Sequence, residues 1–126
     1  METTAAAVMS TQEVAERFHV LAQSGNWSQI QDEMFAENAV SIEPSNSPGL
    51  QTAEGLAAIR EKGKKFGEML EDMHGGYTNE PQVAGRYFAC AMGMDATMKG
   101  MGRMKLDEIA LYEVKDGKIV KEQFFY

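Results

Sequence analysis

The apolar positions of the chain follow two different periods, one in each half. In the first half they recur every three or four residues, which predicts three helices beginning near Ser10, Trp27 and Thr52. Glu13 lies three residues after Ser10, a spacing typical of a capping box at the start of a helix. Gly25 is expected to end the first helix, after which the second can begin at once.

Beyond residue 71 the apolar residues alternate with a period of two, which predicts strands. Four long strands are expected here, and a short one precedes the third helix. They cover residues 38–44, 73–83, 86–99, 103–114 and 118–126. Pro81 has no backbone N–H, so the strand that contains it must bend or lie at an edge of the sheet. Three helices followed by antiparallel strands predict an α+β fold.

The strand over residues 86–99 has one face of large apolar residues and one face of small or polar residues. The residues expected to lie under the helices are Phe88, Cys90, Met92, Met94 and Met98. A methionine-rich face of this kind is either plain core or the wall of a pocket that adapts to a ligand, because thioether side chains are flexible.

A hairpin is predicted for the last two strands, and its register depends on the turn. A two-residue turn at Asp116-Gly117 predicts four cross-strand pairs. They are Val114 with Ile119, Leu111 with Glu122, Ile109 with Phe124, and Asp107 with Tyr126. A turn with a glycine bulge would shift this register by one residue and exchange Asp107 for Glu108 on the inner face.

Neither face of this hairpin is a plain solvent face, so the sheet needs two covers. The three helices can cover one face, where carboxylates among aromatic residues indicate a concave site rather than a sealed core. A second copy of the chain is the economical cover for the other face, to which this register assigns Ala110, Tyr112 and Phe125. The sequence therefore predicts a homodimer through the outer face of the sheet.

The overall composition narrows the classes of function. The chain has 126 residues, which fits one domain over residues 1–126, with residues 1–9 expected to be flexible. A net charge of −7 argues against binding to nucleic acid or to an anionic membrane, and no apolar run is long enough to span a bilayer. One cysteine and a beginning without a signal-peptide pattern predict a reduced, cytoplasmic protein. The basic stretch at 62–65 is interpreted as the solvated side of a helix.

The order of these elements resembles a SnoaL-like domain. The resemblance lies in the segments SGNW, MFAENAVSIEP, GLQTAEGLAAIREK and VKDGKIVKEQFFY, and it covers nearly the whole chain. SnoaL-like domains belong to the nuclear-transport-factor-two-like superfamily, which also contains ketosteroid isomerase, scytalone dehydratase and polyketide cyclases. The resemblance implies a cone-shaped, cystatin-like fold, in which three N-terminal helices pack on a curved, largely antiparallel sheet. It does not imply one function, because this scaffold serves enzymes and binding proteins alike.

Compared with ketosteroid isomerase, the chain keeps one part of the active site and lacks another. Glu43, before Pro44, falls at the position of the isomerase's general base. Phe18 falls at or beside the tyrosine of the oxyanion hole and has no hydroxyl group. Ile109 falls near the protonated aspartate of the isomerase, with Glu108 adjacent. The resemblance thus implies a base without its oxyanion hole, so steroid isomerisation is not expected.

Three side chains are candidates for proton transfer. Glu122 should project under the helices, where burial would raise its pKa; the alternative is a structural pair with Lys105 or Arg103. Glu43 is the second candidate, and His74 is the third because histidine titrates near neutral pH. The residues expected to line the ligand site are Phe88, Met92, Met94, Asp107, Ile109, Phe124 and Tyr126.

The sequence leaves two functions open. The first is a cofactor-free isomerase, cyclase or dehydratase that moves protons on an apolar carbonyl or polyketide-like compound. The second is a dimer that binds a small apolar molecule or another protein without chemistry. Neither function needs a cofactor, and the histidines at positions 19 and 74 form no metal-binding motif.

Overall fold

The fold is given by a computed structural model, which describes residues 8–47 and 49–126. The flexibility predicted for residues 1–9 concerns mainly residues 1–7, which lie outside the described residues. In chain order the elements are α1 (Thr11–Gln23), α2 (Trp27–Met34), β1 (Phe35–Ile42), β2 (Ala53–Glu54), α3 (Leu56–Met69), β3 (Leu70–Thr78), β4 (Gln82–Ala84), β5 (Tyr87–Met98), β6 (Gly102–Lys115) and β7 (Lys118–Phe125).

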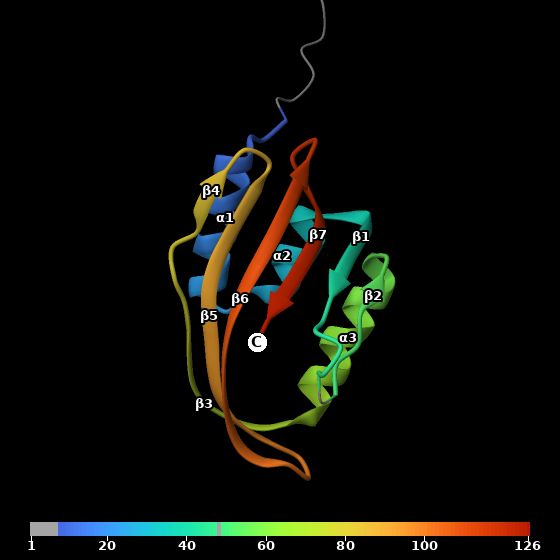
Figure 1. Cartoon of the computed structure of the whole chain (residues 1–126), viewed down its shortest axis with the longest axis vertical. Coiled ribbons are helices and arrows are strands. Elements are labelled where there is room, and N and C mark those ends of the chain that lie inside the picture. Colours follow the sequence, from blue (N-terminus) through green and yellow to red (C-terminus); the bar gives the residue numbers. More distant parts are fainter. Residues whose placement is uncertain (1–7, 48) are drawn as a thin grey trace, which may run out of the picture.

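The strands form a seven-stranded sheet in the order β2-β1-β7-β6-β5-β3, with β4 paired to β5. β1 runs parallel to β7, and the other neighbouring strands pair antiparallel. α1 and α2 lie behind the sheet in the view of Figure 1, and α3 stands beside β1 and β2. The α+β architecture predicted from the sequence is confirmed. Within residues 8–47 and 49–126, no helix is both long enough and apolar enough to cross a membrane.

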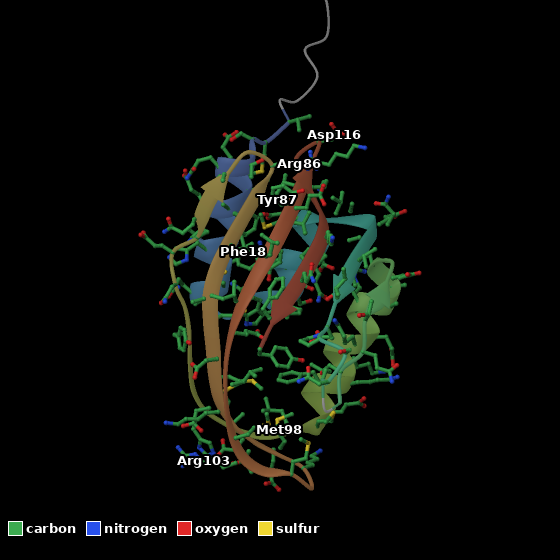
Figure 2. All side chains as sticks on the ribbon, in the orientation of Figure 1. Phe18, Arg86, Tyr87, Met98, Arg103 and Asp116 are labelled. Carbon is green, nitrogen blue, oxygen red and sulfur yellow. The ribbon has the colours of Figure 1, made fainter. Side chains whose placement is uncertain are left out.

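α1 begins with the predicted capping box and covers an aromatic core. Ser10 Oγ accepts a hydrogen bond from the backbone of Glu13 (3.1 Å), and the Glu13 carboxylate accepts one from the backbone of Ser10 (2.9 Å). The ring of Phe18, labelled in Figure 2, lies 4.7 Å from that of Tyr112 and 5.3 Å from that of Phe88 between centroids. Phe88, which was expected to line the ligand site, therefore belongs to the core.

α3 begins later than the sequence predicts. The chain forms β2 after Thr52, and Gly55 then turns it with a φ of 90° so that the helix starts at Leu56. Thr52 does not cap the helix, because its hydroxyl accepts a hydrogen bond from the backbone N–H of Glu43 (3.1 Å). This bond fixes the chain just beyond β1, where the candidate site begins.

The strand predicted over residues 73–83 is divided near Pro81, as its missing N–H requires. β3 ends at Thr78, and β4 begins at Gln82 and pairs with one end of β5. On the outer face of β3, the ring of Tyr77 lies directly against Gly93 of β5. A side chain at Gly93 would collide with this ring, so the glycine permits the aromatic residue to lie flat on the sheet.

The terminal hairpin has the predicted turn but not the predicted register. Residues 116–117 form a two-residue turn with φ values of 51° and 75°. Val120 in β7 then forms a bulge, so Glu122 lies opposite Tyr112 instead of Leu111. The predicted pairs that are wrong for this reason are Leu111 with Glu122, Ile109 with Phe124, and Asp107 with Tyr126.

The bulge decides which side chains of β6 face the helices. Ala110 and Tyr112 are buried on the inner face, so their predicted place on the outer face is wrong. Ile109 and Phe125 lie on the outer face and are 47% and 48% exposed. Glu108 shares the inner parity of β6, which is the alternative that a bulged hairpin predicted.

Candidate functional site

Four elements bring polar side chains together on the inner face of the sheet. Ser41 of β1 lies opposite Glu122 of β7 in the parallel pair, and Glu43 follows two residues later on the same side. Glu108 comes from β6, the neighbour of β7. α3 packs against β1 and supplies Lys62. We call Glu43, Glu108 and Glu122 the carboxylate cluster.

Glu122 is held by two hydroxyl groups. Ser41 Oγ donates to Glu122 Oε2 (2.7 Å), and the Tyr112 hydroxyl donates to Oε1 (3.1 Å). Burial of the carboxylate raises the pKa of Glu122, and these hydrogen bonds offset part of that rise. Arg103, one of the partners considered from the sequence, pairs instead with Asp95 (2.8 Å) at the far end of the β5–β6 hairpin (Figure 2).

Lys62 connects Glu122 to Glu43. Its Nζ donates to Ser41 Oγ (2.6 Å) and to Glu43 Oε2 (2.8 Å), and it lies 5.6 Å from the centroid of the Phe124 ring. The side chains of Lys62 and Glu43 are only 13% and 4% exposed. The ion pair is therefore largely removed from water, where each charge depends on the other for its stabilisation.

Tyr126 extends the network toward the surface. Its hydroxyl donates to Glu43 Oε1 (2.7 Å). Ser47 Oγ lies 2.7 Å from the Tyr126 hydroxyl oxygen, to which it can donate. Burial raises the pKa of Tyr126 to about 12, so this hydroxyl keeps its proton at neutral pH. The polar contacts run without a break from Tyr112 to Tyr126.

Glu108 differs from the other two carboxylates of the cluster. Its pKa is raised to about 7, chiefly by burial. The negative charges of Glu43 and Glu122 also raise this pKa, and the smaller opposing effect of Lys62 lowers it. Among the described residues Glu108 has no hydrogen-bonded partner, whereas both oxygens of Glu43 and of Glu122 are occupied. Three carboxylates thus lie near one ammonium group, and their mutual repulsion favours the protonated form of Glu108.

Two hollows meet at Tyr126. One is an apolar cavity of about 120 Å³ between α3 and the far half of the β5–β6 hairpin. The other is an open depression of about 330 Å³ beside Glu43 and Phe124. Tyr126 lines both, and Ser47 lines the apolar cavity. The polar network therefore borders an apolar space, an arrangement that suits a ligand with one polar and one apolar end.

The residues predicted to line a ligand site divide into three groups. Met94 lines the apolar cavity, Phe124 lines the depression, and Tyr126 lines both. Met92, like Phe88, is buried in the core. Asp107 and Ile109 lie on the outer face, because the bulge at Val120 turns their side of β6 away from the helices.

The predictions for Asp107 and His74 are wrong because both side chains lie on the outer face of the sheet. Asp107 accepts a hydrogen bond from the Tyr77 hydroxyl (2.6 Å), which raises the pKa of Tyr77. His74 Nε2 lies 2.7 Å from Thr97 Oγ1, and its other ring nitrogen lies 3.7 Å from Asp72. The sheet separates these groups from the carboxylate cluster, so His74 cannot relay its protons.

Sequence reasoning missed Lys62, Ser41 and the inward orientation of Tyr112. The stretch at 62–65 was assigned to solvent as a whole, although Lys62 lies three residues after the buried Ile59 and four before Phe66. This spacing places it on the inner stripe of the helix. The helical period could therefore have identified Lys62, whereas its carboxylate partners required the fold.

In the part of the chain that the structure describes, no group of three or more histidine, cysteine, aspartate or glutamate residues is placed to hold a metal ion. Within the carboxylate cluster, Glu43 and Glu122 share a hydrogen-bonded network in which Glu108 takes no part. The chemistry of the cluster, as far as these side chains supply it, is that of proton transfer and hydrogen bonding.

A family model and a solved structure both identify the chain as similar to SnoaL-like proteins. A family model described as a SnoaL-like domain matches residues 9–126. A candidate SnoaL-like polyketide cyclase of Mesorhizobium loti is 34% identical in sequence. Its structure superposes with a TM-score of 0.87, covering 94% of this chain and 100% of that one. The comparison with curated proteins gives no match.

More distant structures show the same fold. A protein of unknown function with a cystatin-like fold from Xanthomonas campestris is 19% identical, with a TM-score of 0.76 over 93% of this chain and 90% of that one. A nuclear-transport-factor-two-like protein from Burkholderia thailandensis is 14% identical, with a TM-score of 0.78 over 94% and 91%. The resemblance and the cystatin-like fold predicted from the sequence are confirmed.

Proposed function

Because the chain belongs to the SnoaL-like domain family, we propose that it is a cofactor-free enzyme that transfers protons on a neutral, largely apolar carbonyl compound of polyketide type. The observation that carries this proposal is the environment of Glu108. Its carboxyl group has a pKa of about 7 and lies on the inner face among two hydrogen-bonded carboxylates. A general acid or base is most effective when its pKa is near the working pH.

In the proposed reaction Glu108 removes a proton from the carbon next to the carbonyl group. The C–H bond breaks, the proton passes to the carboxylate, and the electron pair moves to the carbonyl oxygen as an enolate. The Tyr126 hydroxyl, which lines both hollows, turns its single hydrogen from Glu43 Oε1 to that oxygen and donates a hydrogen bond to it. Where a carbon–carbon double bond adjoins the deprotonated carbon, Glu108 then returns the proton to the far end of that double bond. The double bond moves into conjugation with the carbonyl group, which completes an isomerisation.

Glu43 and Glu122, the candidates from the sequence, take a different role in this proposal. Each already accepts two hydrogen bonds, so neither has a free oxygen aimed at a substrate. Their charges raise the pKa of Glu108 and thereby make it basic enough to take a proton from carbon. They act as positioning residues through Glu108.

The reaction class can be tested without knowing the natural substrate. In D₂O at pH 7.5, the protein is expected to exchange the protons next to the carbonyl group of 2-butanone for deuterium, followed by proton NMR. Glu108→Gln removes the base and should slow this exchange by at least about 100-fold. The exchange rate of the unmodified protein should rise with pH and level off above about 7, because the ionised carboxylate is the active form.

Glu61→Gln is the matched control, because Glu61 lies exposed on α3 and its removal should leave the exchange unchanged. Equal exchange by Glu108→Gln and the unmodified protein would contradict the assigned role of Glu108. Binding of ketones without any exchange would favour the second candidate function, a non-catalytic ligand-binding domain. That candidate is supported by Phe18, which packs in the core where ketosteroid isomerase has its oxyanion-hole tyrosine.

We further propose that two copies of the chain associate through the outer face of the sheet. This face exposes apolar side chains from four strands. They are Tyr77, Tyr87, Ile109 and Phe125. A dimer of ordinary size buries about 1,600 Å² in total, and the aromatic residues of this face are of the kind enriched in such interfaces.

Phe125→Asp is expected to abolish the dimer, because it places a charge in the middle of an apolar contact. Sedimentation velocity at micromolar concentration would show a dimer for the unmodified protein and a monomer or aggregate for the variant. Val20→Asp is the control, since Val20 is also exposed but lies on α1. A monomeric unmodified protein at these concentrations would refute the association.

The prediction of a reduced, cytoplasmic location is kept as part of this proposal. It is consistent with Cys90, the single cysteine, which is a free thiol. Cys90 is buried, and burial raises the pKa of its thiol to about 11. A protonated, enclosed thiol is a structural residue of the core and not a reactive group.

A further inference from the structure

The apolar cavity is lined by an unusual number of methionines. Half of the ten methionines in the chain border it. They are Met69, Met94, Met98, Met101 and Met104. Met98 lies in the lower half of the molecule in Figure 2, well separated from Phe18 and its aromatic core. The core beneath α1 is filled by aromatic and branched residues, so the two ends of the inner face differ in the kind of side chain that fills them.

This difference in side chains has a physical consequence. Methionine has three rotatable side-chain bonds and a polarisable sulfur, so it adjusts to the shape of what it contacts. A set of branched residues would fill the space and hold one shape. The cavity of about 120 Å³ is therefore bounded by walls that can give way to an incoming group. A rigid apolar cavity of roughly 150 Å³ accepts benzene, which sets the scale of the occupant.

The cavity adjoins the proton-transferring group. Leu106 lines the cavity and lies two residues before Glu108 on the same face of β6, a separation of about 7 Å along a strand. Met94, paired with Leu106 across the sheet, is likewise one step along the inner face from Met92, which pairs with Glu108. Glu108 itself is not among the residues that line the cavity, so a molecule whose reacting carbon lies at Glu108 reaches the cavity by extending about 7 Å along the inner face to Leu106.

The charge near Glu108 restricts the ligand further. Glu43 and Glu122 are the anions that face it from β1 and β7, and Lys62 is the cation that faces it from α3. Cys90, Tyr112 and Tyr126 are the other titratable groups close to it on the inner face. An anionic ligand would add a negative charge to a group of side chains already short of positive charge, so a neutral one fits better.

We infer that the substrate is a neutral carbonyl compound with a short, unbranched or flat apolar arm of about four to six carbon atoms, held in the methionine-lined cavity. This inference rests on the proposed function, because the arm is defined from the carbon that Glu108 deprotonates. The arm contributes binding energy away from the reacting carbon. Its contacts hold the carbonyl group beside the Tyr126 hydroxyl.

A series of straight-chain methyl ketones from acetone to 2-nonanone tests the inference. Affinity measured by proton NMR of ¹³C-methyl-labelled methionines should increase about fourfold for each added CH₂ group, until the cavity is full. The methyl signals of Met94, Met98 and Met104 should shift on binding, whereas that of Met34, which lies in the core, should not. Sodium hexanoate, with the same arm and a negative charge, should bind at least tenfold more weakly than 2-heptanone.

Met104→Trp fills the cavity and should remove the dependence of affinity on chain length. Met104→Phe serves the same purpose with less added volume, in case the larger variant does not fold. Val20→Trp, at an exposed position of α1 away from the cavity, is the control and should keep the dependence. Affinity independent of chain length in the unmodified protein would overturn the inference even if ketone exchange depends on Glu108. If the unmodified protein binds longer ketones more tightly but exchanges none of their protons for deuterium, the proposed reaction is refuted and the cavity is still supported as the binding site.

Discussion

Lys62→Met is expected to destabilise the protein by about 3–5 kcal/mol, measured as the free energy of unfolding in urea at pH 7. Lys62 is the cation of a largely buried ion pair with Glu43 and also donates to Ser41 Oγ. Methionine fills a similar volume but leaves the carboxylate of Glu43 buried without a cation, with only the hydrogen bond from Tyr126. Breaking a buried pair in this way usually costs several kcal/mol, because the remaining charge has lost its hydration and has no compensation.

Two variants isolate the cause of this loss. Lys65→Met lies on the exposed side of the same helix and should change the free energy of unfolding by less than about 0.5 kcal/mol. Adding Glu43→Gln to Lys62→Met removes the stranded charge and should recover part of the loss. A loss no larger than that of Lys65→Met would mean that Lys62 and Glu43 form an ordinary surface ion pair.

The periodicity of the sequence was sufficient to predict the three helices, the long strands, and the buried faces of α1 and β5. The helical repeat that contains Phe18, and the alternation in β5, depend only on neighbouring residues in the chain. These local patterns identify which side of an element is buried. They do not identify which buried groups meet, because that depends on how the elements pack.

The site could be predicted only in part for this reason. Glu122 was correctly expected on the inner face, but its partners Ser41 and Tyr112 come from other strands whose registers depend on the bulge at Val120. A bulge adds one residue to one strand, and nothing in the residues around Val120 required it. The same shift placed Glu108 on the inner face. The sequence had predicted Glu108 there only as an alternative to Asp107.

Glu108→Gln is expected to stabilise the protein at pH 8 by about 2 kcal/mol while it abolishes the proposed proton transfer. The folded state raises the pKa of Glu108 from its ordinary value of 4.5 to about 7. A raised pKa means that the folded protein binds this proton more tightly than the unfolded chain does. The favourable contribution is complete below pH 4.5 and is lost as the pH rises through about 7. The full shift corresponds to about 3 kcal/mol, and solvent that reaches the carboxyl group reduces it to about 2.

The dependence on pH separates this effect from a simple change in packing. At pH 4.5 to 5 glutamine and protonated glutamate are nearly the same in shape and charge, so the variant and the unmodified protein should be about equally stable. Their free energies of unfolding should diverge between pH 5 and 8, whereas Glu61→Gln, on the exposed side of α3, should show no such divergence. A carboxylate that stabilised the fold by pairing with a cation would give the opposite result, with the variant less stable at pH 8. A residue that weakens the fold at the pH where it would be active is retained for function and not for stability, which is the usual relation at a catalytic site. Stability curves of these two variants against pH therefore test the assignment of Glu108 independently of any substrate.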